Sequence, residues 1–244
     1  MKALIVGASA GFGKDLCYSL AGKGYSLVIT SSDKKDLIPL VADIKFKFGT
    51  KISYFVIDAK DPISSISKII KFFKNQSKPN VILFPIGFVS DLDNLNYHFK
   101  NFDNIFNVNL KVIVGICSFM IPFMKKLKSP VIVGFGSIAS VRGRDKNIVY
   151  SAAKRALESY FESLRFAMQD TNLLVQFYRL GYIESHSSIY KKLVFKPYRS
   201  VLLANKVTAN LNKDFGISTQ PFFWSIISQI LKLLPWFLFK KIKQ

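Results

Sequence analysis

The stretch Ala3-Leu-Ile-Val6, followed by Gly7-Ala-Ser-Ala-Gly11-Phe-Gly13, decides the fold of this 244-residue chain. The apolar run predicts a buried strand, and the segment after Gly13 has the apolar spacing of a helix. Between them, glycines permit a tight turn, let the backbone approach a pyrophosphate and allow close helix–strand packing, while free N–H groups and the helix dipole attract negative charge. We interpret this stretch as a dinucleotide-binding turn; a purely structural turn is the alternative.

Short apolar runs alternate with helical stretches along most of the remaining chain. Strands are expected near residues 2–7, 26–30, 52–57, 80–85, 130–136, 173–178 and 216–219, and helices near 12–23, 34–48, 62–75, 98–127, 151–170 and 200–212. This alternation predicts an α/β fold, a doubly wound, Rossmann-like parallel sheet of about seven strands with helices on both faces. Ligands then bind at the carboxyl ends of the strands. We expect one domain, with residues 1–220 as its dinucleotide-binding and catalytic part and residues 221–244 as a C-terminal amphipathic extension.

Composition narrows the class of protein. Half of the residues are hydrophobic and a fifth are charged, which is typical of a folded globule. Cys17 and Cys117 fall inside expected helices, so they predict neither a disulfide framework nor a metal site. The apolar run at the start is too short for a signal peptide, and we therefore expect a cytoplasmic protein without a bound metal.

The charge is strongly positive and unevenly distributed. The formal net charge is +20, and residues 191–244 contain ten Lys or Arg but only one acid, Asp214. Because these cations accompany apolar residues and no nucleic-acid-binding module, they favour an anionic membrane surface as partner over nucleic acid. A coding bias towards lysine, spread over the surface, is the alternative.

A serine, a tyrosine and a lysine follow the fifth expected strand. Ser137 ends that strand, and Tyr150-Ser-Ala-Ala-Lys154 comes thirteen residues later. Residues four apart share one helix face, so Tyr150 and Lys154 are expected to point together into the crevice. An ammonium beside a phenol lowers the phenol's pKa from about 10 towards the working range. These residues predict general acid–base chemistry at Tyr150, with Ser137 stabilising charge on a substrate oxygen.

Together, the glycine spacing and the Ser137, Tyr150 and Lys154 set resemble the short-chain dehydrogenases/reductases, over roughly residues 2–219. The resemblance implies a nicotinamide-dependent oxidoreductase that moves a hydride to or from a carbonyl carbon. It implies Asn109 as a fourth catalytic residue, which would hold its helix open around a water in a proton relay to the lysine; Asn107 is the neighbouring alternative. The cofactor-binding residues that it implies are Gly7, Ser9, Gly11, Phe12, Gly13, Ser31, Ser32, Asp58, Gly87, Tyr150, Lys154, Gly181 and Ile183.

Cofactor choice is predicted from the end of the second strand, Thr30-Ser31-Ser32-Asp33. Hydroxyls stand where NAD-selective members would have a carboxylate, so a 2′-phosphate would meet no repulsion and NADP is favoured, with NAD still open. Alternatively, Ser31 and Ser32 cap the next helix, and Asp58, the implied adenine-binding residue, caps the helix after Pro62.

Two segments depart from the family's pattern. Where Asn-Ala-Gly is usual, this chain has Phe84-Pro85-Ile86-Gly87, and the usual Pro-Gly and later Thr are replaced by Leu180-Gly181 and Ser185. We therefore expect different packing beside the cofactor. A catalytically silent dinucleotide-binding redox sensor, or a membrane-associated scaffold, is the alternative function.

The chain continues beyond the last expected strand with an apolar tail. If residues 222–234 are helical, Ser225, Ser228, Gln229 and Lys232 form one narrow polar stripe, and Pro235 ends the helix. Such a helix is too short to span a bilayer. We expect residues 222–243 to contact an anionic membrane surface at its cytoplasmic face, or else to pack on the domain or on a second subunit. The tail also resembles a bacterial branch of the family that reduces a keto sugar carried on polyprenyl phosphate. This resemblance implies a lipid-linked or otherwise apolar carbonyl substrate, and a small-molecule carbonyl substrate is the alternative.

Two further surfaces are predicted. A homodimer would use Leu157, Tyr160, Phe161 and Leu164 of the helix after the fifth strand, unless these residues belong to the core. Arg142, Arg144 and Arg179 would flank the crevice as solvated rim charges or as contacts for an anionic substrate.

Overall fold

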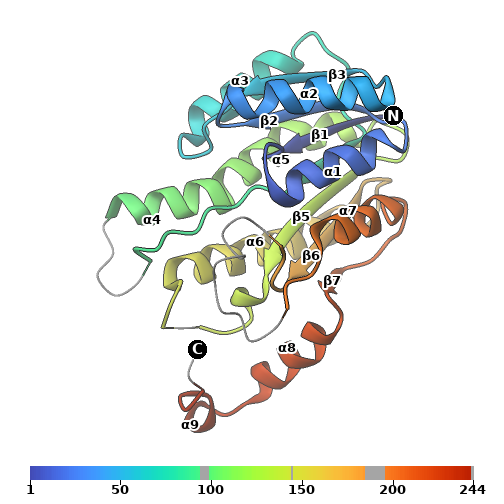
Figure 1. Ribbon diagram of the computed structural model, residues 1–244. Coiled ribbons are helices and arrows are strands. Elements are labelled where there is room, and N and C mark those ends of the chain that lie inside the picture. Colours follow the sequence, from blue (N-terminus) through green and yellow to red (C-terminus); the bar gives the residue numbers. More distant parts are fainter. Residues whose placement is uncertain (94–98, 144, 185–195, 243–244) are drawn as a thin grey trace.

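The computed structural model describes residues 1–93, 99–143, 145–184 and 196–242. Its seven strands form one parallel sheet in the order β3-β2-β1-β4-β5-β6-β7 (Figure 1). The strands are β1 (Lys2–Val6), β2 (Ser26–Ser31), β3 (Ile52–Val56), β4 (Val81–Phe84), β5 (Val131–Ser137), β6 (Leu174–Leu180) and β7 (Ile217–Gln220). The predicted doubly wound sheet is confirmed. Arg144, Ser185 and Lys243 lie outside the described residues.

Helices connect the strands at the predicted places. They are α1 (Gly11–Ala21), α2 (Lys34–Phe48), α3 (Pro62–Phe73), α4 (Phe99–Phe106), α5 (Val112–Met124), α6 (Ile148–Ala167), α7 (Ser200–Ala209), α8 (Phe223–Leu233) and α9 (Trp236–Phe239). A π-helical turn, η1 (Asn107–Lys111), joins α4 to α5, and a 3₁₀ turn, η2 (Ile138–Ser140), follows β5. The single long helix expected before β5 is thus one helical stretch that contains a π turn.

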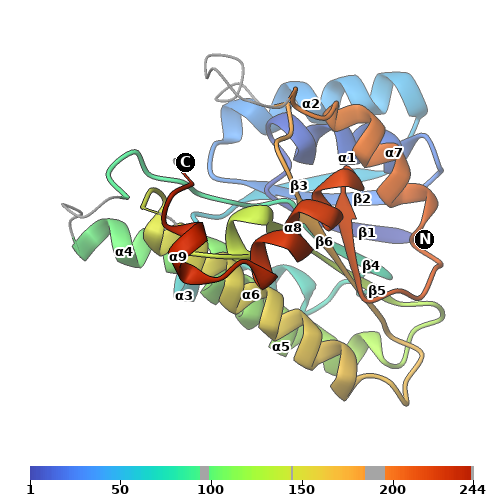
Figure 2. The same ribbon diagram turned by 90° about the horizontal axis from the view of Figure 1, so that it is seen from below.

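The two faces of the sheet bury two separate cores because residues of each strand alternate between them. On one face, α1, α2 and α7 cover side chains such as Ile5 and Ile29. On the other, α3, α5 and α6 cover Leu4, Val28 and Ile82. Figures 1 and 2 show these helical layers on either side of the strands. Central strands buried on both faces explain the nearly continuous apolar runs in the sequence.

The position of β1 between β2 and β4 reverses the direction of the crossovers, and this reversal creates the crevice in which doubly wound folds bind ligands. The glycine turn lies there. Gly7 has φ +94°, and a Cβ on Gly13 would lie 2.0 Å from the Gly7 carbonyl oxygen. Glycine at position 13 is therefore what lets α1 begin in contact with the end of β1.

The residues considered for a homodimer contact belong mainly to the core. Leu157 and Phe161 are fully buried and Leu164 is 9% exposed, all within the core beneath α6. A Cβ on Gly134 of β5 would lie 2.5 Å from the Phe161 ring, so α6 packs directly on the strand. Only Tyr160 of the four is partly exposed. Core packing accounts for Leu157, Phe161 and Leu164, whereas a subunit contact that includes Tyr160 stays a prediction.

One helical stretch of the described chain, Asn101–Met124, is long and apolar enough to cross a membrane by length and composition. It carries Ile113, Ile116 and Met120 into the core against the sheet. Its apolar character is therefore accounted for by burial on the sheet. The tail helix α8 has 11 residues and is shorter than a spanning helix.

The C-terminal extension follows the edge strand β7 and packs back through a few side chains. Trp224, Ser228 and Phe239 are buried, whereas Gln229 and Lys232 are exposed. The predicted helix is seen as α8, and its polar stripe runs from the buried Ser228 to the exposed Gln229 and Lys232.

The contact between Gly13 and Gly7 predicts a position-specific loss of stability. Gly13→Ala is expected to lower the free energy of unfolding by about 2 kcal/mol or more, since the new methyl group overlaps a backbone oxygen that cannot move without displacing β1. Gly143→Ala is the matched control, because nothing lies within 4 Å of its Cβ position. Urea unfolding of both variants measures the difference, and an equal effect at the two positions would contradict this packing.

Candidate active site

A first cavity, of about 290 Å³, lies at the carboxyl ends of β1, β2 and β3. It is lined by Gly7, Ser9, Ser31, Ser32, Asp58 and Gly87, all predicted cofactor residues, and by Lys60 among others. The Ser31 hydroxyl donates a hydrogen bond of 2.7 Å to the Ser9 hydroxyl, which joins the end of β2 to the glycine turn. The polar side chains of its lining are therefore three serine hydroxyls, the Lys60 ammonium and the Asp58 carboxylate.

The alternative roles of these polar residues as helix caps are not seen. Asp33, rather than Ser31 or Ser32, caps α2 by accepting a hydrogen bond from the Lys35 amide. Asp61 caps α3 through the Ser64 amide. The Asp58 carboxylate instead accepts from the Lys60 amide and remains exposed at the cavity. Ser31, Ser32 and Asp58 thus have no helix-capping role.

The start of α1 is suited to an anion. No described side chain caps its N-terminus, and its first turn contains no acidic residue, so its amide groups are not neutralised. Gly11 has φ +50° and open space around its Cβ position. Gly11 and Gly13 do not line either cavity; they shape the turn that presents these amides.

A second cavity, of about 270 Å³, lies at the carboxyl ends of β5 and β6. Its lining includes Phe12, Ser137, Tyr150, Lys154, Gly181 and Ile183. Pro85, Ile86 and Gly87 line both cavities, so the two lie on either side of the segment after β4. The departure from the family's pattern at Pro85 and Ile86 therefore forms the partition between the two cavities, and the departure at Leu180 lies in the wall of the second.

Lys154 is the charged group buried most deeply in the second cavity. Only 4% of the residue is exposed, and its ammonium donates a 3.1 Å hydrogen bond to the Phe135 carbonyl oxygen of β5. Its nitrogen lies 5.9 Å from the centre of the Tyr150 ring, on the same helix one turn away. Burial lowers the pKa of Lys154 to about 8, because desolvation disfavours the ammonium.

Asn109 lies in the π turn and is fully buried. Its amide nitrogen donates to the carbonyl oxygens of Phe88 (2.7 Å) and Ile105 (2.9 Å), and its amide oxygen accepts from the Phe88 N–H (3.3 Å). A Cβ on Gly87 would lie 3.5 Å from the Asn109 oxygen and 3.7 Å from the Lys154 nitrogen. Asn109 and Lys154 therefore both lie beside Gly87, whereas Asn107, the alternative, donates to the Lys60 carbonyl oxygen.

Asp93 is a site-forming residue that sequence reasoning missed. It is 3% exposed, and its two carboxylate oxygens accept 2.8 Å hydrogen bonds from the amides of Val149 and Tyr150. Asp93 thus caps α6 from a different segment of the chain. Asn147, which directly precedes α6, has φ +56° and makes no side-chain cap. This cap fixes the backbone at Tyr150. Its separation of more than fifty residues from α6 left no local sequence signal.

A buried ion pair also surrounds the site and was not predicted. Arg179 of β6 is 8% exposed and pairs with Glu158 of α6, two turns after Tyr150. The Ser140 hydroxyl bonds to Glu158 (2.9 Å) and to the Ser137 carbonyl oxygen (2.7 Å). The expectation that Arg179 is a rim charge for an anionic substrate was wrong, because its guanidinium is taken up by Glu158. The pair ties α6, β6 and the turn after Ser137 together.

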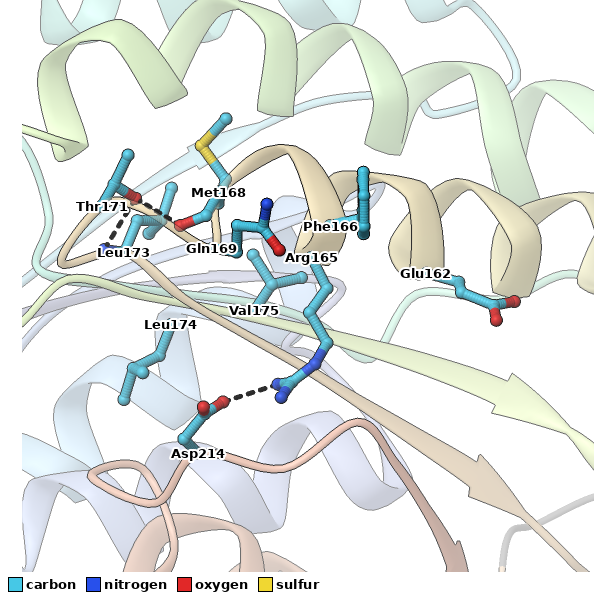
Figure 3. A pocket seen from close by; sticks show the side chains of 10 residues that line it. All are labelled: Glu162, Arg165, Phe166, Met168, Gln169, Thr171, Leu173, Leu174, Val175 and Asp214. Atoms are coloured by element: carbon cyan, nitrogen blue, oxygen red, sulfur yellow. Dashed lines mark hydrogen bonds and ion pairs between the residues drawn. The ribbon is translucent and has the colours of Figure 1, made fainter.

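A larger cavity, of about 360 Å³, lies elsewhere (Figure 3). It is formed where α6 ends and β6 begins, and Arg165 and Asp214 form a 2.6 Å ion pair at its wall. Because it lies at the amino end of β6, it is at the opposite end of the parallel strands from Ser137 and Tyr150. It contains none of the predicted site residues.

Removing one member of the Glu158–Arg179 pair is expected to be more harmful than removing both. Arg179→Met should lower the free energy of unfolding by about 3 kcal/mol, since it leaves a buried carboxylate unpaired. The double variant Glu158→Met/Arg179→Met should recover most of that loss. Denaturant unfolding of the wild type, both single variants and the double variant gives the coupling free energy. Additive losses would show that the two side chains do not interact.

Sequence relatives with curated functions include several carbonyl reductases. The chain is 25% identical to the 3-oxoacyl-[acyl-carrier-protein] reductase of Buchnera aphidicola over 185 residues, covering 75% of this chain and 74% of that protein. It is 26% identical to the very-long-chain 3-oxoacyl-CoA reductase of Neurospora crassa over 237 residues, covering 91% of this chain and 69% of the relative.

Solved structures with the same fold are more distant in sequence. L-sorbose reductase from Gluconobacter frateurii, complexed with NADPH and L-sorbose, has a TM-score of 0.81 at 16% identity, covering 91% of this chain and 95% of that one. A short-chain dehydrogenase from Sphingobium yanoikuyae, in complex with NADPH, has a TM-score of 0.84 at 15% identity, covering 100% and 96%. The short chain dehydrogenase family model matches residues 1–192, most of the sequence. The chain therefore belongs to the short-chain dehydrogenase family.

Proposed function

We propose that this protein is an NADPH-dependent reductase of a carbonyl compound, with residues 1–220 as the dinucleotide-binding and catalytic domain and residues 221–244 as its extension. The observation that carries the proposal is the gathering of Ser137, Tyr150 and Lys154 around one cavity, next to a second cavity formed by the glycine turn and Ser31. Oxidation of the corresponding alcohol is the same reaction in reverse.

The two cavities fit a dinucleotide. A pyrophosphate would be bound at the uncapped start of α1, beside Gly7 and Ser9. The adenosine end would lie against Asp58, and the hydroxyls of Ser31 and Ser32 with the Lys60 ammonium would suit a 2′-phosphate, which favours NADP over NAD. At the other end, Gly181 and Ile183 would contact the nicotinamide, which supplies or accepts the hydride when it is bound.

The side chains of the second cavity would manage the proton. In reduction, the Tyr150 hydroxyl gives its proton to the substrate oxygen, and Ser137 donates a hydrogen bond to the same oxygen. The Lys154 ammonium stabilises the phenolate that forms. It is held by the Phe135 carbonyl oxygen, and Asn109 of the π turn lies near it beside Gly87. Asn109 would hold the helix open so that water can return the proton to Lys154.

We further propose an apolar or lipid-linked carbonyl substrate, encountered in the cytoplasm at the cytoplasmic face of a membrane. Two features support this proposal. The wall of the second cavity includes apolar side chains such as Phe135, Leu180 and Ile183. The C-terminal tail exposes apolar side chains together with lysines, which suits a membrane surface that contains anionic lipids. A keto sugar carried on polyprenyl phosphate combines these two chemistries.

Replacing the Tyr150 hydroxyl separates catalysis from cofactor binding. Tyr150→Phe is expected to reduce the rate of NADPH oxidation with a carbonyl substrate at least about a hundredfold, because the substrate oxygen loses its proton donor. NADPH binding, followed by quenching of intrinsic fluorescence, should change little. Full activity in Tyr150→Phe would exclude this mechanism, and binding without turnover in the wild type across a panel of carbonyl compounds would instead support a dinucleotide sensor.

The lowered pKa of Lys154 predicts the pH above which its side chain loses its positive charge. The ammonium is present below about pH 8 and is lost above it, while most lysines keep their proton up to about pH 10. In the cofactor-free protein, lysine side-chain NMR should therefore show one ammonium that titrates near pH 8 and is missing in Lys154→Met. Titration of every lysine near pH 10 would contradict the burial described here.

A further inference from the structure

The C-terminal helices expose their apolar side chains instead of burying them. Six are large and more than half exposed: Phe222 (71%), Ile226 (56%), Ile230 (56%), Leu233 (83%), Trp236 (67%) and Phe237 (60%). We call these six residues the tail surface. In Figures 1 and 2, α8 and α9 lie outside the helical layers of the sheet, so this surface is not part of the core.

The exposure follows from the orientation of α8. Phe222, Ile226, Ile230 and Leu233 recur at intervals of four and three residues and therefore share one helix face. The buried residues Trp224 and Ser228 lie on the opposite face. The helix thus packs on the protein through a tryptophan and a serine and turns its most apolar face outward. An apolar patch of this kind marks a contact with a partner.

Exposed lysines accompany the tail surface along the sequence. Lys232, Lys240 and Lys241 are exposed beside it, and the sequence has no acidic residue after Asp214. In a symmetric contact between two copies, the same surface meets itself, which would bring these lysines together without a neutralising carboxylate. A bilayer with anionic lipids accepts both features, since the apolar side chains enter the acyl boundary and the ammonium groups contact phosphates.

The tail is tied to the segment between η2 and α6, which connects Ser137 to Tyr150 in the sequence. The Arg142 guanidinium, two residues after η2, donates to the carbonyl oxygens of Leu231 (2.6 Å) and Leu234 at the end of α8 and lies 4.1 Å from the centre of the Phe239 ring. A cation at the C-terminus of a helix donates hydrogen bonds to carbonyl oxygens that lack partners within the helix, and it interacts favourably with the helix dipole. Arg142 is therefore a tail anchor, and the expectation of a rim charge for substrate was wrong.

Trp224 makes the second connection. A Cβ on Gly181 would lie 2.3 Å from the indole ring, and Gly181 lines the second cavity together with Tyr150. The Trp224 ring also lies 5.7 Å from that of Tyr182, edge to face. Trp224 lies between Phe222 and Ile226 of the tail surface in the sequence, and it packs on Gly181, which lines the cavity.

We propose that α8 and α9 form a docking surface for an anionic lipid bilayer, and that Arg142 and Trp224 fix this surface so that the second cavity lies beside the bound bilayer. The α8 helix, at about 1.5 Å per residue, would lie in the plane of the interface rather than cross it. The second part of the proposal rests on the proposed function, because only a reductase with an apolar or lipid-linked substrate has a use for this placement.

Vesicle flotation of the full-length protein tests the docking. We expect it to float with phosphatidylcholine vesicles that contain about a third phosphatidylglycerol and to remain unbound with phosphatidylcholine alone. Ile226→Gln/Leu233→Gln should weaken binding at least about tenfold, because the two glutamines cannot insert favourably into the acyl boundary. Both positions are exposed, so the substitutions should leave the fold unchanged. The matched control is Phe46→Gln/Ile63→Gln, two residues that are 90% and 80% exposed on α2 and α3, and it should bind like the wild type.

The two tryptophans of the chain report the orientation. With brominated lipids in the same vesicles, Trp236 fluorescence in Trp224→Phe should be strongly quenched, whereas Trp224 fluorescence in Trp236→Phe should be much less affected, since Trp224 is 7% exposed. Equal binding by the two double variants, binding without anionic lipid, or a dimer that the tail variant splits without any flotation would each overturn the proposal. NADPH binding is measured in every variant, so that loss of the reductase function is distinguished from loss of docking.

Discussion

A positive charge buried beside the carboxyl end of β5 is the constraint on which the site depends. Moving an ammonium out of water is costly, so Lys154 can stay charged only where the fold supplies partners. The Phe135 carbonyl oxygen is one such partner. The remaining cost is visible in the lowered pKa of Lys154. A charge held at this cost beside Tyr150 is a marker of function rather than of stability.

The surrounding structure holds that lysine in position from three directions. Asp93 fixes the start of α6, Glu158 joins the same helix to Arg179 of β6, and Ser140 connects this pair to the backbone of Ser137. None of these four residues lines the second cavity, whereas Ser137 and Tyr150 do. The positioning network is thus continuous with the sheet, which is the rigid part of the molecule.

The strands and the main motifs could be predicted from the sequence because their signals are local. The apolar runs of β1, β4 and β5 reflect burial on both faces, and the spacing of Tyr150 and Lys154 is a property of any helix. Asp93, Glu158 and Arg142 could not be identified in this way, because each acts on a segment far away in the chain. The contact between Trp224 and Gly181 was missed for a related reason, since it joins residues that are far apart in the sequence. The same contact explains why this turn keeps its glycine although the proline before it is replaced by Leu180.

The account is tested most directly by a crystal structure of the protein with NADP⁺. It predicts the adenosine 2′-phosphate beside Ser31 and Ser32, the pyrophosphate at the start of α1, and the nicotinamide in the second cavity with the Tyr150 hydroxyl facing its reactive carbon. A nucleotide bound outside these two cavities, or a nicotinamide kept away from Tyr150 by Pro85 and Ile86, would contradict the central claim that a buried ammonium and a phenol serve hydride transfer here.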